Sequence, residues 1–376
     1  MRAVILAAGL GTRLEPLTLG RSKGMISVAN KPLLHWIASG FGDAIIVARR
    51  DQTDILEHFS GREIVFQEEP KGTADALLSA KGSVDGDFVV VNGDDLFSGE
   101  DIRKFVGSKG CGIAVSKHET PEMFGSVETE GEKISKILEK HPSGKGMVNC
   151  GMYRLDERIF KYLKKIDPSG RGEYELTDSI NLAVKDGVYF DAVEVEGWQT
   201  VSHPWDILDA NAKVLQETGS IISESAEIRP GAFIEDPVAI GGNTVIGPNC
   251  YIRKFSSIGA GCRIGNAVEI KNSVIMENSH VSHLSYVGDS VIGKNCNIGA
   301  GTIFANLRLD DGEVSMGIKG EKVLTGRRKL GSIIGDNVKI GVNVTLMPGR
   351  KIWPGMMVPP CFLVKEDMAK QPSLRL

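Results

Sequence analysis

The second half of the chain repeats with a period of six residues, and this periodicity restricts the fold more than any other feature of the sequence. Branched aliphatic residues occupy every sixth position at 222, 228, 234, 240, 246, 252, 258, 264 and 270. The series continues at 275, 281, 287, 292 and 298, with two steps of five, and resumes at 334, 340, 346, 352 and 358. Chance does not produce such a series, and a short regular repeat predicts a solenoid in which each turn packs on the next.

Many repeats begin with an aliphatic residue followed by glycine, as in IGPNCY, IGAGCR and IGKNCN, and a small residue stands four places after the aliphatic one. The pattern resembles the hexapeptide repeat of left-handed parallel β-helices, whose triangular coils contain three hexads and eighteen residues. In that geometry the aliphatic and the small residue point inward, and glycine relieves the tight corner. Cys250, Cys262 and Cys296 occupy the small inward position, so we predict that these thiols fill the core and form neither disulfides nor a catalytic site.

About the first 215 residues follow a different pattern, in which short apolar runs alternate with stretches of helical spacing. The runs RAVILAA, DAIIVA, EIVFQ and DFVVVN are typical of buried strands, and helical spacing occurs in KPLLHWIAS, TADALLSAKG and SINLAVKDG. The alternation predicts a parallel α/β sheet, whose ligands bind beyond the carboxyl ends of its strands. We therefore predict an α/β domain over residues 1–218 and a β-helix over 219–376, with an inserted loop at about 305–332 where the repeat breaks.

The distribution of charge gives little reason to expect a polyanionic partner. The formal net charge is −4, which favours neither nucleic acid nor an anionic membrane. The insertion carries Arg308, Arg327, Arg328 and Lys329 among its basic residues, and we expect it to project from the solenoid as an arm. The sequence does not decide whether this arm binds a ligand or is a charged surface that only contacts water.

The amino-terminal run MRAVILAAG is too short and too interrupted by glycine for a signal peptide or a membrane span. The six cysteines show no CxxC pair and no metal-ligand spacing, which favours a reducing compartment. We expect a cytoplasmic protein that binds neither nucleic acid nor membrane.

The segment ILAAGLGTRLEP, residues 5–16, follows the first predicted strand and combines glycines with a cation. Gly9 and Gly11 supply the first two glycines of a dinucleotide-binding loop, but Leu14 stands where the third is expected and Arg13 precedes it. A glycine loop lets backbone N–H groups approach phosphates closely, and an arginine neutralises phosphate charge. The segment therefore predicts phosphate chemistry at the end of this strand.

LAAGLGTRLEPLT and the following RSKGMISVANKPLL resemble the opening of the sugar-1-phosphate nucleotidylyltransferases, a family with a Rossmann-like fold. Further motifs follow in the family's order between residues 67 and 211: QEEPKGTADAL, VNGDD, FGSV, ILEK, NCGMY, ELTD and PWDILDAN. The resemblance implies that a sugar phosphate oxygen attacks the α-phosphorus of a nucleoside triphosphate and expels pyrophosphate. Because two highly charged reactants must meet, positioning and charge neutralisation would dominate catalysis.

The same resemblance implies roles for residues of this sequence. Arg13 and Lys23 are the implied catalytic cations, and Asp94 is the implied ligand of Mg²⁺, with its neighbour Asp95 as an alternative. The implied nucleotide-binding residues are Leu6, Ala8, Gly9, Gly11, Thr12, Gln67, Gly72 and Thr73. The residues implied to hold the sugar phosphate are Gly125, Glu139, Lys140 and Asn149.

Two departures from the family pattern concern the metal and the lysine. The distal motif of the family usually reads WxDxGxPWD, with the aspartate as a second metal ligand, whereas this chain reads WQTVSHPWD and has Thr200 at that position. A hydroxyl is a poorer magnesium ligand than a carboxylate. Lys23 also follows Ser22, where proline is usual. Because of these departures, a nucleotidyl site that is slow or has lost its activity is an alternative that the sequence does not decide against.

A second resemblance falls within the repeat, at SHVSHLSYVGDSVIG, residues 279–293. Val281 and Val287 keep the inward positions, so His283 and Tyr286 should point outward, where core packing requires no histidine. The segment resembles the HLTYLGD motif of the bifunctional uridylyltransferase/acetyltransferases that make UDP-N-acetylglucosamine, which implies His283 as the general base. An imidazole that titrates near neutrality suits removal of a proton from an amino group as it attacks acetyl-CoA.

Arg253 and Lys271 each follow the aliphatic residue of a hexad and lie eighteen residues apart, which is one coil. Adjacent strands are about 4.8 Å apart, so two stacked cations should repel each other unless an anion, such as a sugar phosphate, lies between them. The resemblance implies phosphate contacts for both residues and substrate contacts for Tyr286, Asn297 and Asn306. The segment after Asn306 is more similar to archaeal-type bifunctional enzymes than to bacterial ones.

We predict a bifunctional enzyme of nucleotide-sugar synthesis. Its β-helix would N-acetylate glucosamine-1-phosphate, or galactosamine-1-phosphate, with acetyl-CoA as co-substrate. Its N-terminal domain would join the sugar-1-phosphate to a nucleotide from UTP, or dTTP, with Mg²⁺ and release of pyrophosphate. By analogy with such solenoids we expect a homotrimer with acetyl-CoA between subunits. Two alternatives stay open: a nucleotidylyltransferase with a purely structural β-helix, and a non-catalytic regulatory or scaffold protein, for which Thr200 is the only support.

Overall fold

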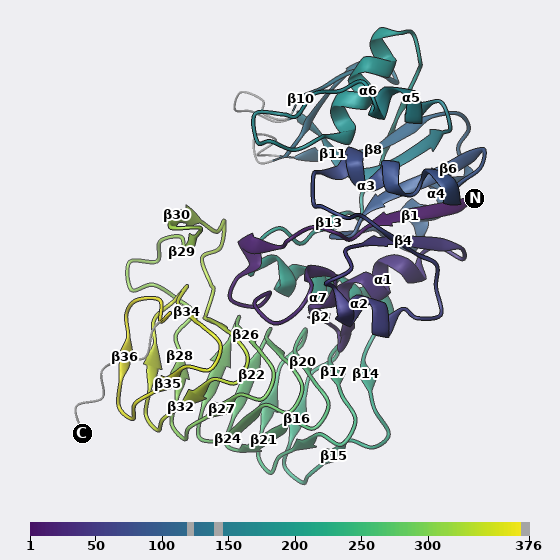
Figure 1. Ribbon diagram of the computed structural model, residues 1–376. Helices are drawn as coiled ribbons and strands as arrows, with labels where there is room; N and C mark the ends of the chain where they lie inside the picture. Colours follow the sequence, from purple (N-terminus) through teal and green to yellow (C-terminus); the bar gives the residue numbers. More distant parts are fainter. Residues whose placement is uncertain (119–123, 139–145, 370–376) are drawn as a thin grey trace. The chain divides into compact units, whose positions relative to one another are not determined.

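The chain forms two compact units in the computed structural model, which describes residues 1–118, 124–138 and 146–369 (Figure 1). The first unit comprises Met1–Leu10, Ser22–Met25 and Leu33–Thr200. The second comprises Gly11–Arg21, Ile26–Pro32 and Val201–Leu376. Two short segments before residue 33 thus belong to the unit that contains the carboxyl-terminal half, and the domain boundary placed after residue 218 stays a prediction.

A nine-stranded mixed sheet forms the centre of the first unit, in the order β5-β4-β1-β6-β11-β8-β12-β10-β9. Its parallel part consists of β1 (Arg2–Leu6), β4 (Ala44–Ala48), β5 (Ile64–Phe66) and β6 (Asp87–Asn92). These are the apolar runs predicted to be strands, and the α/β prediction is confirmed. The other strands are β8 (Gly112–His118), β9 (Ser126–Glu130), β10 (Lys133–Leu138), β11 (Gly146–Asp156) and β12 (Asp191–Glu194).

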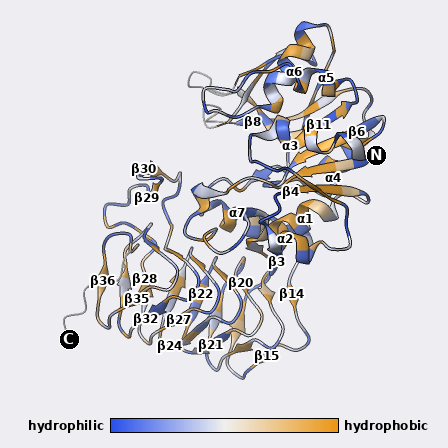
Figure 2. Cartoon of the chain, viewed as in Figure 1, coloured by the Kyte–Doolittle hydropathy of each residue, from blue (hydrophilic) through white to orange (hydrophobic). Residues whose placement is uncertain are grey.

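Helices pack against this sheet and enclose an apolar core. They are α1 (Leu33–Ser39), α2 (Thr53–His58), α3 (Thr73–Ser79), α4 (Gly99–Gly107), α5 (Ile159–Leu163) and α6 (Leu176–Lys185), with short 3-10 turns η2 (Lys23–Met25) and η3 (Lys81–Ser83). Val4, Leu77, Val90 and Ile180 are fully buried in this core, and the apolar colour follows the central strands in Figure 2. Beside the sheet, β7 (Asp95–Leu96) pairs antiparallel with β13 (Gln199–Thr200).

Three seven-stranded parallel sheets form the sides of the β-helix in the second unit, as the repeat predicts. The first contains β14 (Ile221–Ile222), β17 (Ala239–Ile240), β20 (Ser257–Ile258), β23 (Val274–Ile275), β26 (Val291–Ile292), β31 (Ile333–Ile334) and β34 (Lys351–Ile352). The second contains β15 (Glu227–Ile228), β18 (Val245–Ile246), β21 (Arg263–Asn266), β24 (His280–His283), β27 (Asn297–Ile298), β32 (Lys339–Ile340) and β35 (Met357–Val358). The third contains β16 (Phe233–Ile234), β19 (Tyr251–Ile252), β22 (Glu269–Lys271), β25 (Tyr286–Gly288), β28 (Ile303–Phe304), β33 (Thr345–Leu346) and β36 (Leu363–Val364).

The repeating aliphatic residues stack in register from coil to coil. Ile240 pairs with Ile258, a step of eighteen, and Ile258 pairs with Ile275, a step of seventeen. Ile292 pairs with Ile334, so the stack continues across the insertion. Each fully buried isoleucine side chain stabilises the fold by roughly 1.5–3 kcal/mol relative to its exposure, and this column of side chains therefore accounts for much of the stability of the solenoid.

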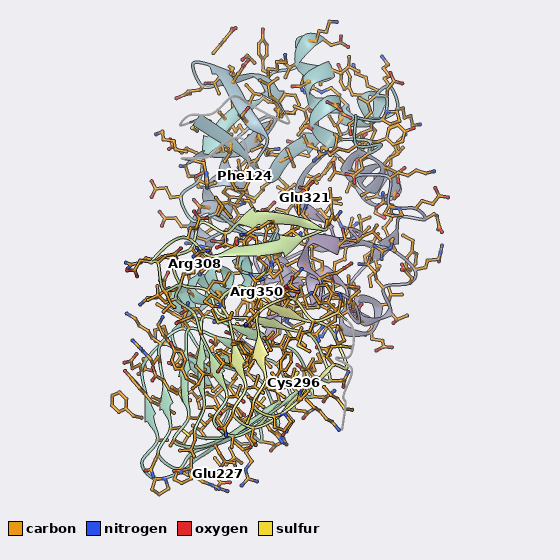
Figure 3. All side chains as sticks on the ribbon, turned by 90° about the vertical axis from the view of Figure 1, so that its left-hand side faces the viewer. Phe124, Glu227, Cys296, Arg308, Glu321 and Arg350 are labelled. Atoms are coloured by element: carbon orange, nitrogen blue, oxygen red, sulfur yellow. The ribbon has the colours of Figure 1, made fainter. Side chains whose placement is uncertain are left out.

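The cysteines of the repeat fill the core, as predicted. Cys250, Cys262 and Cys296 are buried among the stacked aliphatic residues and form no disulfide (Cys296 is labelled in Figure 3). Burial raises the pKa of the Cys262 thiol to about 12 and that of the Cys296 thiol to about 11. These groups are therefore uncharged and unreactive packing residues.

At Gly259, which follows Ile258, glycine has a different role from the predicted relief of a corner. A Cβ at Gly259 would lie 2.5 Å from the backbone nitrogen of Glu277, so the close approach of the next coil is what requires glycine there. The left-handed backbone conformation occurs two residues further on, for example at Asn278 and Asn295, with φ of 57° and 56°. Asparagine tolerates this conformation better than most residues.

The insertion forms an arm that projects from the coils, built on the hairpin of β29 (Ser315–Ile318) and β30 (Glu321–Leu324), as Figures 1 and 3 show. Its arginines form ion pairs: Arg308–Asp310, Arg328–Asp311 and Arg327–Asp209. These pairs favour a charge-compensated arm over an anion-binding one. The second unit also contains η1 (Thr12–Leu14), β2 (Ser27–Val28), β3 (Lys31–Pro32) and α7 (Asp206–Thr218).

Candidate active sites

The carboxyl end of β1 leads into an open stretch of backbone. Gln52 Nε2 donates to the carbonyl oxygen of Ala7 at 3.1 Å, and Arg49 donates to that of Ala8, so the residues after Leu6 are held in place. A Cβ at Gly9 would meet no atom within 4 Å. Packing within the protein therefore does not require glycine at this position, whereas a ligand that approaches the backbone would.

Lys23 and Asp94 are brought together in the first unit. Lys23 begins η2, Asp94 follows β6, and the two partly buried side chains form an ion pair. Across residues 1–118, 124–138 and 146–369 no group of three or more His, Cys, Asp or Glu side chains could hold a metal ion. Magnesium is usually bound by one or two carboxylates together with substrate phosphates, so Asp94 fits a magnesium ion that enters with a triphosphate.

Asp95 is buried and held by three donors from the protein. Trp198 Nε1 donates to one carboxylate oxygen at 2.9 Å, Asn92 Nδ2 donates to the other at 2.9 Å, and the hydroxyl of Thr200, its partner across β7 and β13, also bonds to it. Burial, together with the negative charge of Asp94, raises the pKa of Asp95 to about 7, although these donors oppose the shift. Because both oxygens already accept hydrogen bonds, Asp95 is less suited than Asp94 to bind a metal.

Gln67, Gly72 and Thr73 lie together at the start of α3. Gln67 Nε2 donates to the carbonyl oxygen of Gly72 at 3.1 Å and to Asp75 at 2.7 Å. Gly72 has a φ of 112°, and a Cβ there would lie 2.5 Å from the carbonyl oxygen of Tyr174. Glycine is therefore required by the fold at this position, and the local structure explains the residue without a nucleotide.

Gly125 and Asn149 are also neighbours, since Asn149 N donates to the carbonyl oxygen of Gly125 at 2.7 Å. Asn149 Nδ2 donates to the hydroxyl of Tyr153 at 2.7 Å. Beside Gly125, the ring of Phe124 packs edge-on against Trp198 at a centroid distance of 5.2 Å (Phe124 is labelled in Figure 3). Glu139 and Lys140, the other two residues predicted to hold the sugar phosphate, lie outside the described residues.

Gly11, Thr12 and Arg13 belong to the second unit. Gly11 has a φ of 66°, which glycine adopts without strain, and the hydroxyl of Thr18 donates to its carbonyl oxygen at 3.0 Å. Arg13 follows in η1 and is exposed. The predicted phosphate-binding loop is thus divided between the two units after Leu10.

A buried carboxylate, Asp289, links three of the residues predicted to bind the acetyl acceptor. It accepts from Lys271 Nζ at 2.8 Å and from Asn306 Nδ2 at 2.5 Å. Asn306 Nδ2 also donates to the hydroxyl of Tyr286 at 3.0 Å. The absence of a side chain at Gly288 permits this arrangement, because a Cβ there would lie 2.4 Å from the Tyr286 hydroxyl.

Arg253 and Lys271 do not require an anion between them, contrary to the argument from like charges. Arg253 Nη1 lies 3.2 Å from the carboxylate of Glu269, and Lys271 is paired with Asp289. Each cation therefore has its own acidic partner on the next coil. Glu269 pairs in register with Tyr286, which places Arg253 beside the same group of residues. The phosphate contacts of Arg253 and Lys271 stay a prediction from the resemblance.

His283 ends β24 and is exposed on the outside of the solenoid, three residues before Tyr286. Asn297 lies on the next strand of that sheet, where it pairs in register with His280, a residue without a predicted role. The structure thus brings Lys271, Tyr286 and Asn306 into direct contact around Asp289. His283 and Asn297 lie on the preceding side of the coil.

Two residues of these sites were not identified from the sequence. Asp289 stands eighteen residues after Lys271, and the same spacing relates Lys271 to Arg253. The length of one coil could therefore have identified Asp289 from the sequence. Trp198 connects Asp95 to Phe124, and no sequence signal relates these three residues.

Known proteins are similar to this chain along almost its whole length. Residues 2–217 match the family described as nucleotidyl transferase, and residues 245–346 match the GMPPB C-terminal domain. The "Bifunctional protein GlmU" of Methanococcus vannielii is 38% identical over 99% of this chain and 96% of its own length. The "Bifunctional sugar-1-phosphate nucleotidylyltransferase/acetyltransferase" of Sulfurisphaera tokodaii is 40% identical over 98% of each chain.

One solved structure is similar to a little over half of this chain. It is a proposed glucose-1-phosphate thymidylyltransferase from Bacillus anthracis, 27% identical, with a TM-score of 0.50 over 58% of this chain and 96% of that one. No helix in the described part of the chain is long and apolar enough to cross a membrane.

Proposed function

Because the chain belongs to the family of bifunctional sugar-1-phosphate nucleotidylyltransferase/acetyltransferases, we propose that it converts glucosamine-1-phosphate to UDP-N-acetylglucosamine. The β-helix first transfers the acetyl group of acetyl-CoA to the amino group, and the N-terminal half then joins the N-acetylated sugar phosphate to UMP from UTP. Galactosamine-1-phosphate and dTTP are the closest alternative substrates.

In the acetyl transfer, His283 takes a proton from the sugar amino group as the nitrogen attacks the thioester carbon. The new N–C bond forms, the C–S bond breaks, and coenzyme A leaves as the thiol once protonated. The cluster of Lys271, Tyr286, Asp289 and Asn306 carries this proposal, because core packing does not require such a network on the outside of a solenoid. With Arg253, this cluster holds the sugar phosphate.

In the nucleotidyl transfer, a phosphate oxygen of the sugar attacks the α-phosphorus of UTP, and the bond to pyrophosphate breaks. Lys23 and Arg13 neutralise the charge of the phosphates, and the backbone around Gly9 and Gly11 approaches the triphosphate. Asp94 holds Mg²⁺, which lowers the negative charge on the phosphates when bound. Gly125 and Asn149 hold the sugar, and Gln67, Gly72 and Thr73 line the base.

We also propose that the protein is a cytoplasmic homotrimer with acetyl-CoA bound between neighbouring β-helices. Exposed apolar side chains occur along the third sheet of the solenoid, at Phe233 on β16, Ile303 on β28 and Leu363 on β36. Contact with other subunits would remove this apolar surface from water. Sedimentation equilibrium of the full chain tests the trimer.

The direct test of the two activities supplies glucosamine-1-phosphate, acetyl-CoA, UTP and Mg²⁺ and follows free thiol and pyrophosphate separately. We expect both to be released. If thiol is released but no pyrophosphate is released with either UTP or dTTP, the protein is an acetyltransferase only. Pyrophosphate without thiol would leave a nucleotidylyltransferase with a structural β-helix.

A further inference from the structure

We infer that Gln52 and Arg49 position the backbone of Ala8 and Gly9 so that two amide N–H groups bind oxygen atoms of the nucleoside triphosphate. The inference rests on the nucleotidyl transfer proposed above and concerns the binding of its nucleotide. All four residues belong to the first compact unit. Gln52 and Arg49 are positioning residues, because each contacts the loop and neither is placed against a substrate.

The turn after β4 lies beside the loop after β1. The two strands are parallel neighbours, and Leu6 pairs in register with Val47. Ligands of α/β proteins bind at the edge where the carboxyl ends of such strands meet. The turn begins at Arg49, directly after Ala48, and Gln52 immediately precedes α2. Side chains of this turn can therefore reach the backbone that leaves β1.

Gln52 is buried, and both polar atoms of its side chain form hydrogen bonds. Its Nε2 donates to the carbonyl oxygen of Ala7 at 3.1 Å, and its Oε1 accepts from the backbone nitrogen of Arg49 at 2.7 Å. Arg49 Nη1 donates to the carbonyl oxygen of Ala8. Arg49 Nε and Nη2 donate to the two carboxylate oxygens of Asp51 at 2.9 and 3.2 Å, which fixes the direction of the guanidinium.

These two carbonyl groups set the direction of two amides. In a planar trans peptide the N–H points opposite to the C=O, and neither peptide here is cis. The N–H of Ala8 therefore points away from Gln52, and the N–H of Gly9 points away from Arg49. Within the described part of the chain neither N–H donates to a protein acceptor, although only 3% of Ala8 is exposed. A buried amide without a partner is rare, and a ligand oxygen would satisfy it.

The space around Gly9 is open to a ligand. A Cβ at Gly9 would meet no atom within 4 Å, and the residue is exposed. Successive backbone N–H groups that face one side form concave sites for anions, and the phosphates carry the negative charge of the proposed nucleotide. If either peptide rotated, a carbonyl oxygen would replace an N–H and repel the phosphate. Gln52 and Arg49 prevent this rotation.

The test uses the full chain, with UTP and Mg²⁺ as the probe. Gln52→Glu removes one donor at constant size, Arg49→Met removes the other, and Asp51→Asn weakens the hold on the guanidinium. Arg50→Met is the matched control, because it removes the same charge from the same turn and breaks an exposed ion pair with Glu68. We would measure the Kd of UTP, the KM of UTP and of N-acetylglucosamine-1-phosphate, the melting temperature, and hydrogen–deuterium exchange over residues 7–10.

We expect Gln52→Glu and Arg49→Met to raise the Kd and KM of UTP about tenfold, and Asp51→Asn about threefold, because misdirected amides lose hydrogen bonds to charged oxygens. The KM of the sugar phosphate, and all values of the control variant, should stay within about twofold of wild type. In the wild type, UTP should slow the amide exchange of Ala8 and Gly9. A purely structural role would lower the melting temperature without separating the two KM values.

The inference is overturned if the Kd of UTP stays within about twofold of wild type in the folded variants, if the KM of the sugar phosphate rises as much as that of UTP, or if UTP protects neither amide. Asp51→Asn decides the question should the two buried variants fail to fold, because the side chain of Asp51 is 71% exposed. A wild-type chain that releases no pyrophosphate with UTP or dTTP would instead overturn the nucleotidyl assignment on which the inference rests.

Discussion

Lys271 donates a hydrogen bond of 2.8 Å to Asp289, one coil further along the β-helix, and the same carboxylate accepts from Asn306. Asp289 is therefore the residue that orients two groups proposed to hold the sugar phosphate. We predict that Asp289→Asn raises the KM for glucosamine-1-phosphate in thiol release about tenfold, which corresponds to about 1.4 kcal/mol, and leaves pyrophosphate release from N-acetylglucosamine-1-phosphate unchanged. A lowered KM would show instead that Asp289 competes with the phosphate for Lys271.

His283 is predicted to be the base of the acetyl transfer. His283→Ala should lower the rate of thiol release about 10²- to 10⁴-fold, because a positioned base contributes that much to proton transfer. His280→Ala is the matched control, since His280 lies on the same strand and is also exposed. Equal effects of the two substitutions, or thiol release unaffected by either, would remove His283 from the mechanism.

Metal removal should separate the two reactions. We predict that excess EDTA abolishes pyrophosphate release and leaves thiol release within twofold, because only the transfer between phosphates needs a cation. Asp94→Asn should weaken Mg²⁺ binding in the presence of UTP, measured by isothermal titration calorimetry. Asp95→Asn should weaken it less, since Asp95 is already held by Trp198 and Asn92. The reverse order of the two variants would make Asp95 the ligand.

The thiols of the solenoid should be inert. Burial raises the pKa of the Cys262 thiol to about 12 and that of the Cys296 thiol to about 11, so almost no thiolate forms at pH 8, and only thiolate reacts with disulfide reagents. We predict that a thiol-specific reagent modifies Cys361, which is exposed, before any other cysteine in the folded chain, and all six in denaturant. Rapid modification of Cys262 in the folded chain would contradict its place in the core.

The fold could be predicted because its two signals are local and regular. The column from Ile240 to Ile292 needs only the spacing of aliphatic residues, and β1, β4 and β6 need only short apolar runs. The segments Gly11–Arg21 and Ile26–Pro32 could not be placed, because they belong to the β-helix unit through contacts with residues more than 170 positions away, such as Arg21 with Asp336 and Asn30 with Ile258.

The sites were predicted less completely, for a related reason. The sequence related Arg253 to Lys271 by their spacing and predicted that the two cations repel each other. In the structure Glu269 pairs with Arg253 and Asp289 pairs with Lys271, so each positive charge is compensated. A motif identifies one residue at a time, whereas a charge is stabilised or destabilised by every group around it. The same limit applies to Asp95, whose burial and bond to Trp198 follow from the pairing of β7 with β13.

The mass of the product tests the central claim most directly. Glucosamine-1-phosphate, acetyl-CoA, UTP and Mg²⁺ are incubated with the full chain, and the sugar products are identified by mass spectrometry. The account predicts one final product that carries both the acetyl group and the uridylyl group, and none of it when acetyl-CoA is withheld. Products that carry one group or the other, but never both on the same sugar, would contradict it.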